Sequence, residues 1–221
     1  MKGKMKSSIS AREHYDRLAE AGHGRNDPPR LQEYMARWDG PLFFEALGDV
    51  TGKEMLEVGI GCGRIARQVL ALGCRSLTGL DISSKTIASA ESDLGEYANL
   101  ELINADICEF RRPGSFHIAY SVLTFMHVQD KERALGNLAS SLRSGGHLVL
   151  SIDHTTDLID FGEWTVPLHL WPPDRYAETL GGLGCDVEEP VPLIDGWIQP
   201  NGRESDTYGE KIATLIRAIK R

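Results

Sequence analysis

The feature that most constrains this chain is a glycine-rich turn, which places Gly59, Gly61 and Gly63 within five residues. A short apolar run, MLEV, precedes the turn and is typical of a buried parallel strand. Apolar residues at helical spacing follow the turn, and Gly73 is expected to end that helix. Because glycine has no Cβ, the backbone can turn sharply here and lie against a ligand. The pattern predicts strand, turn and helix with a ligand at the turn; a tight turn without a ligand is the alternative.

A second strand is predicted at 76–80, and it ends in Asp81. A carboxylate there, one strand-helix unit after the glycine turn, is placed to accept hydrogen bonds from two ribose hydroxyls. As a strand-end side chain facing a cleft, it is expected to lie outside the core. The dinucleotide fingerprint G-x-G-x-x-G would need glycine where Arg64 stands, and the turn lacks the Lys-Ser/Thr pair of a phosphate-binding P-loop. An NAD-dependent oxidoreductase is therefore the disfavoured alternative.

Composition excludes several classes of protein. A length of 221 residues predicts one α/β domain with additions. The net charge of −8 argues against a nucleic-acid backbone as the main partner. No apolar run has the length of a membrane span, and the basic start MKGKMKSSIS lacks the apolar core of a secretory signal. Four cysteines without C-x-x-C spacing predict reduced thiols in a cytoplasmic protein, with no metal site.

The rest of the chain alternates between strands and helices. Strands are predicted at 100–104, 116–122 and 147–152, with a helix that Asp130 starts before the last of them. Another helix, capped by Ser83 or Ser84, is predicted before 100–104. This rhythm predicts right-handed βαβ units and a parallel sheet.

The two ends of the chain are expected to differ from this pattern. Residues 1–9 are expected to be loosely attached, and helices are predicted from Ser10 to Ala21, at 31–38 and at 42–47. Residues 153–172 are expected to be irregular and are rich in aromatic residues. A helix at 173–183 and a strand at 185–191 are predicted to follow. The last segment, EKIATLIRAIKR, fits a buried strand, although its apolar spacing taken alone favours a helix.

The sequence from Glu57 through Gly63, acidic-x-G-x-G-x-G, resembles motif I of class I S-adenosylmethionine-dependent methyltransferases. Asp81 resembles the acidic residue that ends their second strand. Three later segments resemble motifs of this family in the same order: NADI at 104–107, SVLTFMHV at 121–128 and LRSGGHLVLSI at 142–152. The resemblance extends from Glu54 to the C-terminus and is to the small-molecule branch (methyltransferase type 11/12-like).

This resemblance implies an α/β fold with a Rossmann-like, doubly wound, mainly parallel seven-stranded sheet. It also implies a C-terminal antiparallel hairpin, so that the last segment is a strand. Residues 1–50 are expected to form a helical N-terminal cover that is part of the same domain, and residues 51–221 the S-adenosylmethionine-binding domain.

The implied cofactor is S-adenosylmethionine, with S-adenosylhomocysteine as product and no metal. The residues that the resemblance assigns to it are Glu57, Gly59, Ile60, Gly61, Gly63, Asp81, Ile82, Asp106, Ile107 and Ser121. Tyr15 on the N-terminal helix could also bind the cofactor as a cap, or be a tyrosine that packs between surface and core. In this assignment the methionine part lies over the glycine turn and Ser121, Asp81 binds the ribose and Ile82 lies on the adenine face. Asp106 accepts from the adenine amine, next to the amide of Ile107.

The implied activity is transfer of a methyl group to a small-molecule acceptor by a cytoplasmic monomer or homodimer. His127 is a candidate general base, with a structural brace of its loop as the alternative. Arg30 could hold a substrate anion, or be solvated. Three further side chains could form the wall of an acceptor pocket or pack on one another: Trp164, His169 and Trp171. A methyltransferase-like binding domain without catalysis is the second alternative function.

Overall fold

The computed structural model describes residues 7–22, 40–152, 158–160, 163–199, 201–205 and 207–221. Arg30, Phe161 and the helix predicted at 31–38 lie outside these ranges. The strands of the main sheet are β2 (Glu54–Val58), β3 (Ser76–Asp81), β4 (Leu100–Asn104), β5 (Phe116–Val122), β6 (Leu142–Ile152), β9 (Cys185–Val187), β10 (Val191–Ile194) and β11 (Lys211–Lys220).

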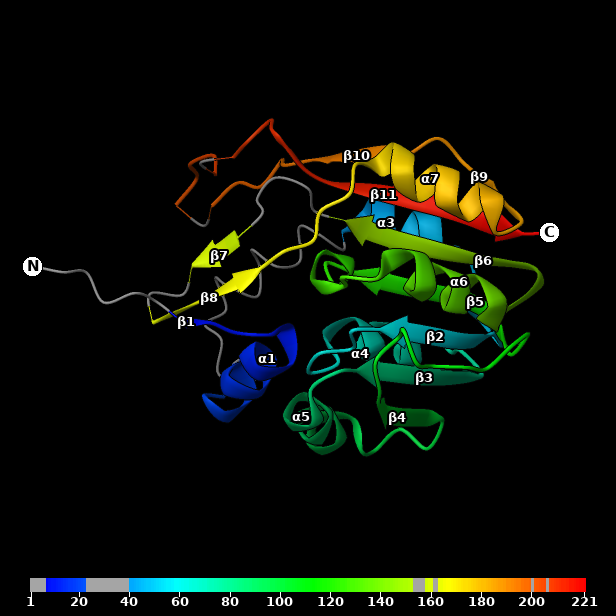
Figure 1. Ribbon diagram of the computed structural model, residues 1–221, viewed down its shortest axis with the longest axis horizontal. Coiled ribbons are helices and arrows are strands. Elements are labelled where there is room, and N and C mark those ends of the chain that lie inside the picture. Colours follow the sequence, from blue (N-terminus) through cyan, green and yellow to red (C-terminus); the bar gives the residue numbers. More distant parts are fainter. Residues whose placement is uncertain (1–6, 23–39, 153–157, 161–162, 200, 206) are drawn as a thin grey trace, which may run out of the picture.

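The main sheet has the order β10-β11-β6-β5-β2-β3-β4, and β9 also pairs with β11 (Figure 1). Within the run β6-β5-β2-β3-β4, adjacent strands are parallel to one another. On the other side of β6, strand β11 is antiparallel to it. From β2 the chain first extends the sheet through β3 and β4, and then returns to the other side with β5 and β6. The carboxyl ends of β2 and β5 therefore form the switch point at which such sheets bind ligands. The predicted fold class is confirmed.

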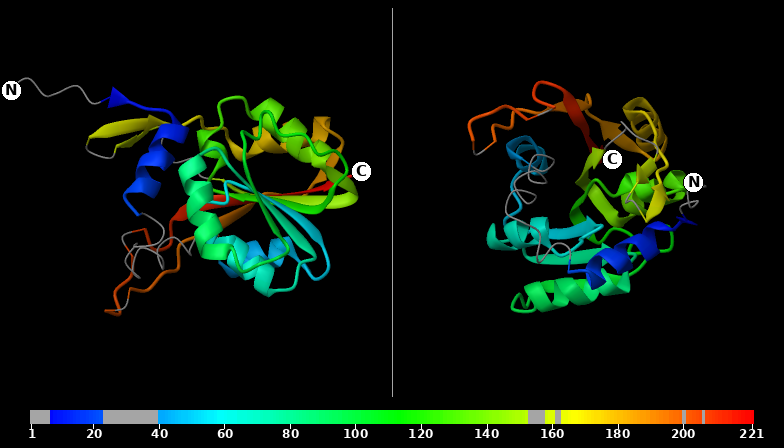
Figure 2. Two further views of the ribbon diagram at one scale, coloured as in Figure 1. Left: turned by 90° about the horizontal axis from the view of Figure 1, so that it is seen from below. Right: turned by 90° about the vertical axis from the view of Figure 1, so that its left-hand side faces the viewer.

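Helices cover both faces of this sheet (Figure 2). The covering helices are α3 (Pro41–Leu47), α4 (Arg64–Ala71), α5 (Ser84–Leu94), α6 (Lys131–Ser141) and α7 (Pro173–Gly182), and α1 (Ala11–Glu20) lies beyond the strand ends. Buried residues of α3, α4 and α5 share one apolar cluster with the sheet, and those of α6 and α7 share a second. The sheet is therefore buried on both faces, which explains why its strands are near-continuous apolar runs.

The C-terminal segment is the strand β11, as the resemblance implied and against its helical spacing. Residues from Ile212 to Ile216 are all buried, so apolar side chains face both ways and a period of two is lost. The predictions of one strand at 185–191 and of seven strands in the sheet are wrong in detail. This strand is divided into β9 and β10, which makes eight strands, and Pro190, which has no N–H to donate, lies between them.

Two further boundaries differ from the prediction. The strand predicted to begin at His147 begins at Leu142, which pairs with Phe116. Residues 7–9 are attached to the fold, contrary to the prediction for the N-terminus. The main-chain N–H of Ile9 donates to the oxygen of Thr165 at 3.0 Å, and its side chain is 8% exposed.

This attachment belongs to a second, three-stranded sheet. Its order is β1 (Ser7–Ser8), β8 (Trp164–Pro167), β7 (Leu158–Asp160), with β1 parallel to β8. The expectation that 153–172 is irregular is therefore wrong where β7 and β8 form. Figure 1 shows this sheet and α1 beyond the carboxyl ends of the parallel strands. Among the helices of the described ranges, none combines the length and apolarity needed to cross a membrane.

Candidate functional site

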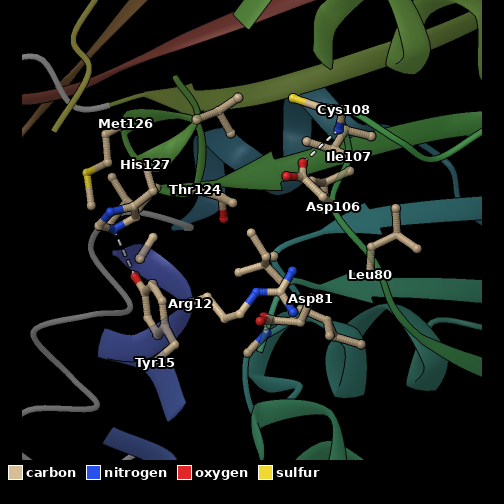
Figure 3. A pocket seen from close by; sticks show the side chains of 18 of the residues that line it. Arg12, Tyr15, Leu80, Asp81, Asp106, Ile107, Cys108, Thr124, Met126 and His127 are labelled. Carbon is tan, nitrogen blue, oxygen red and sulfur yellow. Dashed lines mark hydrogen bonds between the residues drawn. The ribbon is translucent and has the colours of Figure 1, made fainter. Parts of the chain in front are cut away.

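A cavity of about 1020 Å³ opens at the carboxyl ends of the parallel strands. Its walls come from the segments after β2, β3, β4 and β5, from α1, and from the end of β8 (Figure 3). Small-molecule sites commonly span roughly 300–1000 Å³. The cavity therefore has room for a cofactor and a small second ligand.

The glycine turn forms one wall of this cavity. Gly59 and Gly61 both have positive φ, at 78° and 58°, which only glycine adopts without cost. The N–H groups of Gly59 and Ile60 donate to the main-chain oxygen of Leu80, at 2.8 and 2.9 Å. The N–H of Gly61 donates to Asp81 Oδ2 at 3.0 Å. These three amides are therefore bonded inside the protein and are not free to hold a pyrophosphate.

Asp81 ends β3 and is 7% exposed. Its Oδ1 accepts from the N–H of Ser83 at 2.9 Å, while Oδ2 holds Gly61. Burial raises the pKa of Asp81, and nearby Asp16 adds to the rise; the hydrogen bonds oppose it. Each oxygen of a carboxylate has two lone pairs, so this side chain can position the turn and still accept from a ligand.

Another part of the cavity lining is apolar and includes the carboxylate of Asp106. Asp106 follows β4, and its Oδ1 accepts from the N–H of Cys108 at 2.8 Å. Ile60 and Ile107 are 3% and 5% exposed and line the cavity with Ile82. A flat apolar ring with a polar edge would fit between these side chains.

Two predicted residues do not line the cavity. Ser121 is buried, and its hydroxyl donates to the main-chain oxygen of Val58 at 2.8 Å, which ties β5 to β2. Gly63 precedes α4, where a Cβ would approach Leu94 within 2.2 Å. The other assigned residues lie together around the cavity, including Glu57, which accepts from the Tyr120 hydroxyl at 2.9 Å.

His127 and Tyr15 meet at the mouth of the cavity. His127 lies in the 3-10 turn Phe125–His127 after β5, and its Nε2 is 3.0 Å from the Tyr15 hydroxyl (Figure 3). Its Nδ1 is buried and has no partner among the described residues. Burial lowers the pKa of His127 to about 4, assisted by His14, His169 and Lys131. Burial and then Asp81 raise the pKa of Tyr15, so the imidazole is neutral and the phenol protonated at neutral pH.

Sequence reasoning missed Arg12 and Thr124, both of which line the cavity. Figure 3 shows Arg12 extending into it from α1. Arg12 stands three residues before Tyr15, and this helical spacing places both on one face, so a signal for it existed. Thr124 had no such signal, because its role is to fill the space beside Gly59, where a Cβ would lie 2.0 Å from its Oγ1.

Of the three suggested wall residues, only His169 lines the cavity. The Nε1 of Trp164 donates to His14 Nδ1 at 3.2 Å, and Arg17 lies over its ring. Trp171 packs edge-on against Tyr176, with ring centroids 5.5 Å apart. Within the described part of the chain, no group of three or more His, Cys, Asp or Glu side chains is arranged to hold a metal ion.

Acid should destabilise the protein through His127. The pKa is about 4 in the folded protein and ~6.5 in the unfolded chain, so the unfolded chain binds the proton first. The free energy of unfolding therefore falls as the pH drops from ~6.5 toward 4, by up to ~2 kcal/mol at pH ~5. The variant His127→Asn does not titrate and should lose less stability between pH 7 and 5 in chemical denaturation. Equal losses in the two proteins would contradict a buried, neutral His127.

In comparisons with known proteins, residues 56–150 match a family model described as a methyltransferase domain. The ubiquinone biosynthesis O-methyltransferase of Cupriavidus pinatubonensis is 28% identical over 143 residues, 62% of this chain and 56% of that protein. The chain spans about half the length of the curated relatives it matches.

Solved structures share the fold. An S-adenosylmethionine-dependent methyltransferase from Mesorhizobium loti has a TM-score of 0.70 at 20% identity, covering 83% of this chain and 98% of its own. The N-methyltransferase NodS from Bradyrhizobium japonicum, in complex with S-adenosylhomocysteine, has a TM-score of 0.67 at 16% identity. That likeness covers 96% of this chain and 99% of NodS.

Proposed function

We propose that this chain, which belongs to the class I S-adenosylmethionine-dependent methyltransferase family, transfers a methyl group from S-adenosylmethionine to a hydroxyl of a small molecule. The observation that carries the proposal is the glycine turn held to Asp81 at the switch point of the sheet. The hydroxyl is favoured by the names of relatives such as the O-methyltransferase of Cupriavidus pinatubonensis and by the neutral imidazole at the mouth of the cavity.

The residues fit S-adenosylmethionine in charge and shape. The remaining lone pairs of Asp81 suit the two ribose hydroxyls, and the apolar walls Ile60, Ile82 and Ile107 suit an adenine ring. The carboxylate of Asp106, which lines the cavity, suits the exocyclic amine of adenine. Gly61 has open space where a Cβ would stand, so the methionine part can lie against the backbone.

The bound cofactor supplies an activated methyl group on a sulfonium with a neutral leaving group. What remains for the protein is to align the acceptor, exclude water and take up a proton. The Tyr15 phenol stays protonated, and we propose that it donates to His127 Nε2 in the resting site. We propose that the acceptor hydroxyl takes the place of this phenol and passes its proton to Nε2. His127 is thus both the brace of α1 and the base, in successive states.

The remaining assignments are proposals of the same kind. We propose that residues 1–50 are part of the same domain, since α1 contacts α5 and β8 and Tyr15 reaches the central cavity. The net charge of −8 supports a small-molecule partner over nucleic acid. We propose a cytoplasmic monomer or homodimer that uses no metal.

The protein should bind S-adenosylmethionine and S-adenosylhomocysteine and should not bind NAD. The reason is that the turn amides are bonded to Leu80 and Asp81 and cannot hold a pyrophosphate. Isothermal titration calorimetry with each of the three ligands measures this. Heat from NAD with none from either sulfur nucleoside would end the proposal.

The cover should gain order when the cavity is filled. Strand β1, which precedes α1, pairs with β8, and the Trp164–His14 bond joins α1 itself to β8, so α1 and β8 should respond as one unit. Closure over the reacting groups keeps water out. Hydrogen exchange with and without S-adenosylhomocysteine should show slower exchange in both segments and no change in the core strand β6. Slowing of α1 alone would mean that the segments move independently.

A further inference from the structure

Lys131 is completely buried at the start of α6. Lysine is almost never fully buried unless its ammonium is satisfied. No carboxylate lies within ion-pair distance of its Nζ among the described residues. Instead Nζ donates to two main-chain oxygens, those of Val128 at 2.5 Å and of His169. The charge is therefore held by the carbonyls of two segments that are far apart in the sequence.

The same two segments are joined a second time. The main-chain N–H of His169 donates to the oxygen of Met126 at 2.7 Å. Both main-chain polar groups of His169 are thus fixed to the stretch from 126 to 131. His127 lies between Met126 and Val128, whose main-chain oxygens accept the hydrogen bonds from His169 and Lys131. Met126, His127, Val128 and His169 all line the cavity.

We propose that Lys131 is a positioning residue, which fastens the turn carrying His127 to the segment carrying His169 and so sets the place of the imidazole in the site. This inference rests on the proposed function, in which His127 receives the acceptor proton. Lys131 itself touches neither the cofactor site nor the acceptor. It acts through the two carbonyls that it binds.

The charges around His127 agree with this role. Tyr15 and His14 face it from α1, His169 from the segment after β8, and Lys131 from α6. Burial lowers the pKa of Lys131 to about 8, assisted by Arg175 of α7, so most of the ammonium is charged at pH 7. That charge is one of the causes that lower the pKa of His127. Burial keeps the imidazole neutral, and the Lys131 charge adds to that effect while its hydrogen bonds set the position of the turn.

The unaltered protein offers the first test. Nuclear magnetic resonance of ¹⁵N-lysine- and ¹³C-histidine-labelled protein can follow both groups through a pH titration, with His127→Asn to assign the ring. We expect the Lys131 ammonium to titrate near pH 8 and His127 to titrate near pH 4, well below the ordinary value. A His127 that titrates near the ordinary value of ~6.5 would overturn the proposal without any variant of Lys131, because the imidazole would then not be held in its buried position.

Variants separate the charge from the hydrogen bonds. Lys131→Met removes both and keeps an unbranched side chain of similar length, and Lys131→Gln keeps a donor without charge. Lys220→Met is the matched control, because Lys220 Nζ donates to the main-chain oxygen of Leu183 at 2.7 Å, away from the cavity. We expect the pKa of His127 to rise in both Lys131 variants and to stay constant in the control.

Amide chemical shifts report the position of the His127 ring independently of its pKa. The chemical shifts of the Met126–Val128 amides should move most in Lys131→Met, less in Lys131→Gln and not in Lys220→Met. An unchanged His127 titration and unchanged amide shifts in either folded Lys131 variant would overturn the proposal. S-adenosylhomocysteine affinity, measured by calorimetry, should stay within about twofold in all variants, since Lys131 lies outside the cofactor pocket. Failure of the wild-type protein to bind this nucleoside would instead refute the proposed function, and the histidine titrations would still decide the role of Lys131.

Discussion

Replacing Gly59 with alanine should destabilise the protein much more than the same change at Gly61. Both residues have positive φ, so each alanine costs roughly 1–2 kcal/mol in backbone strain. At Gly59 the new Cβ would also lie 2.0 Å from Thr124 Oγ1, 2.6 Å from its Cγ2 and 2.8 Å from its Cβ. This overlap adds roughly 1–3 kcal/mol, because Thr124 follows β5 and its backbone must shift to relieve it.

Gly61→Ala is the matched control, because nothing lies within 4 Å of the Cβ that it would introduce. That Cβ would project beside the cavity, where the methionine part of the cofactor is proposed to lie. We therefore expect Gly61→Ala to weaken S-adenosylhomocysteine binding with a modest loss of stability. Chemical denaturation and calorimetry on both variants measure the two effects. Equal stability losses would show that Thr124 gives way and that the close contact at Gly59 is not a constraint.

Asp81→Ala should weaken S-adenosylhomocysteine binding by ~1.5–3 kcal/mol, or roughly 10- to 150-fold. The change removes the proposed charge-assisted bonds to the ribose. It should also lower the stability of the free protein, because the N–H groups of Gly61 and Ser83 lose their acceptor. The sequence-based expectation that this side chain lies outside the core is wrong, since it is only 7% exposed.

Two variants separate binding from folding in this experiment. Asp81→Asn keeps the shape and one acceptor oxygen, and we expect an intermediate affinity. Asp195→Ala removes a buried carboxylate that accepts from the main-chain N–H of Trp197 and the hydroxyl of Thr207, outside the cavity. It should lower stability without changing the dissociation constant. If Asp81→Ala leaves the dissociation constant unchanged, this residue does not bind the ribose.

Those parts of the fold that depend on local signals were predictable from the amino-acid sequence. Each strand from β2 to β5 was predicted within about a residue, because short apolar runs bounded by turns are typical of a doubly covered sheet. Ser10 and Ser83 cap their helices as predicted, since capping involves residues only three apart. The glycine turn and Asp81 were recognisable because all of their chemistry lies within one βαβ unit, and they carry the resemblance to class I S-adenosylmethionine-dependent methyltransferases.

Contacts between residues far apart in the sequence could be identified from the three-dimensional structure alone. The pairing of β1 with β8, the contact of Gly59 with Thr124 and the bond from Lys131 to His169 join segments 38 to 157 residues apart. Local periodicity carries no information on such pairs, because they depend on how the packed elements bring their loops together. For the same reason, the sequence left two interpretations of His127 open, a general base and a structural brace of its loop. Its pKa and its partners come from α1, α6 and the segment after β8, and burial among them makes the imidazole neutral.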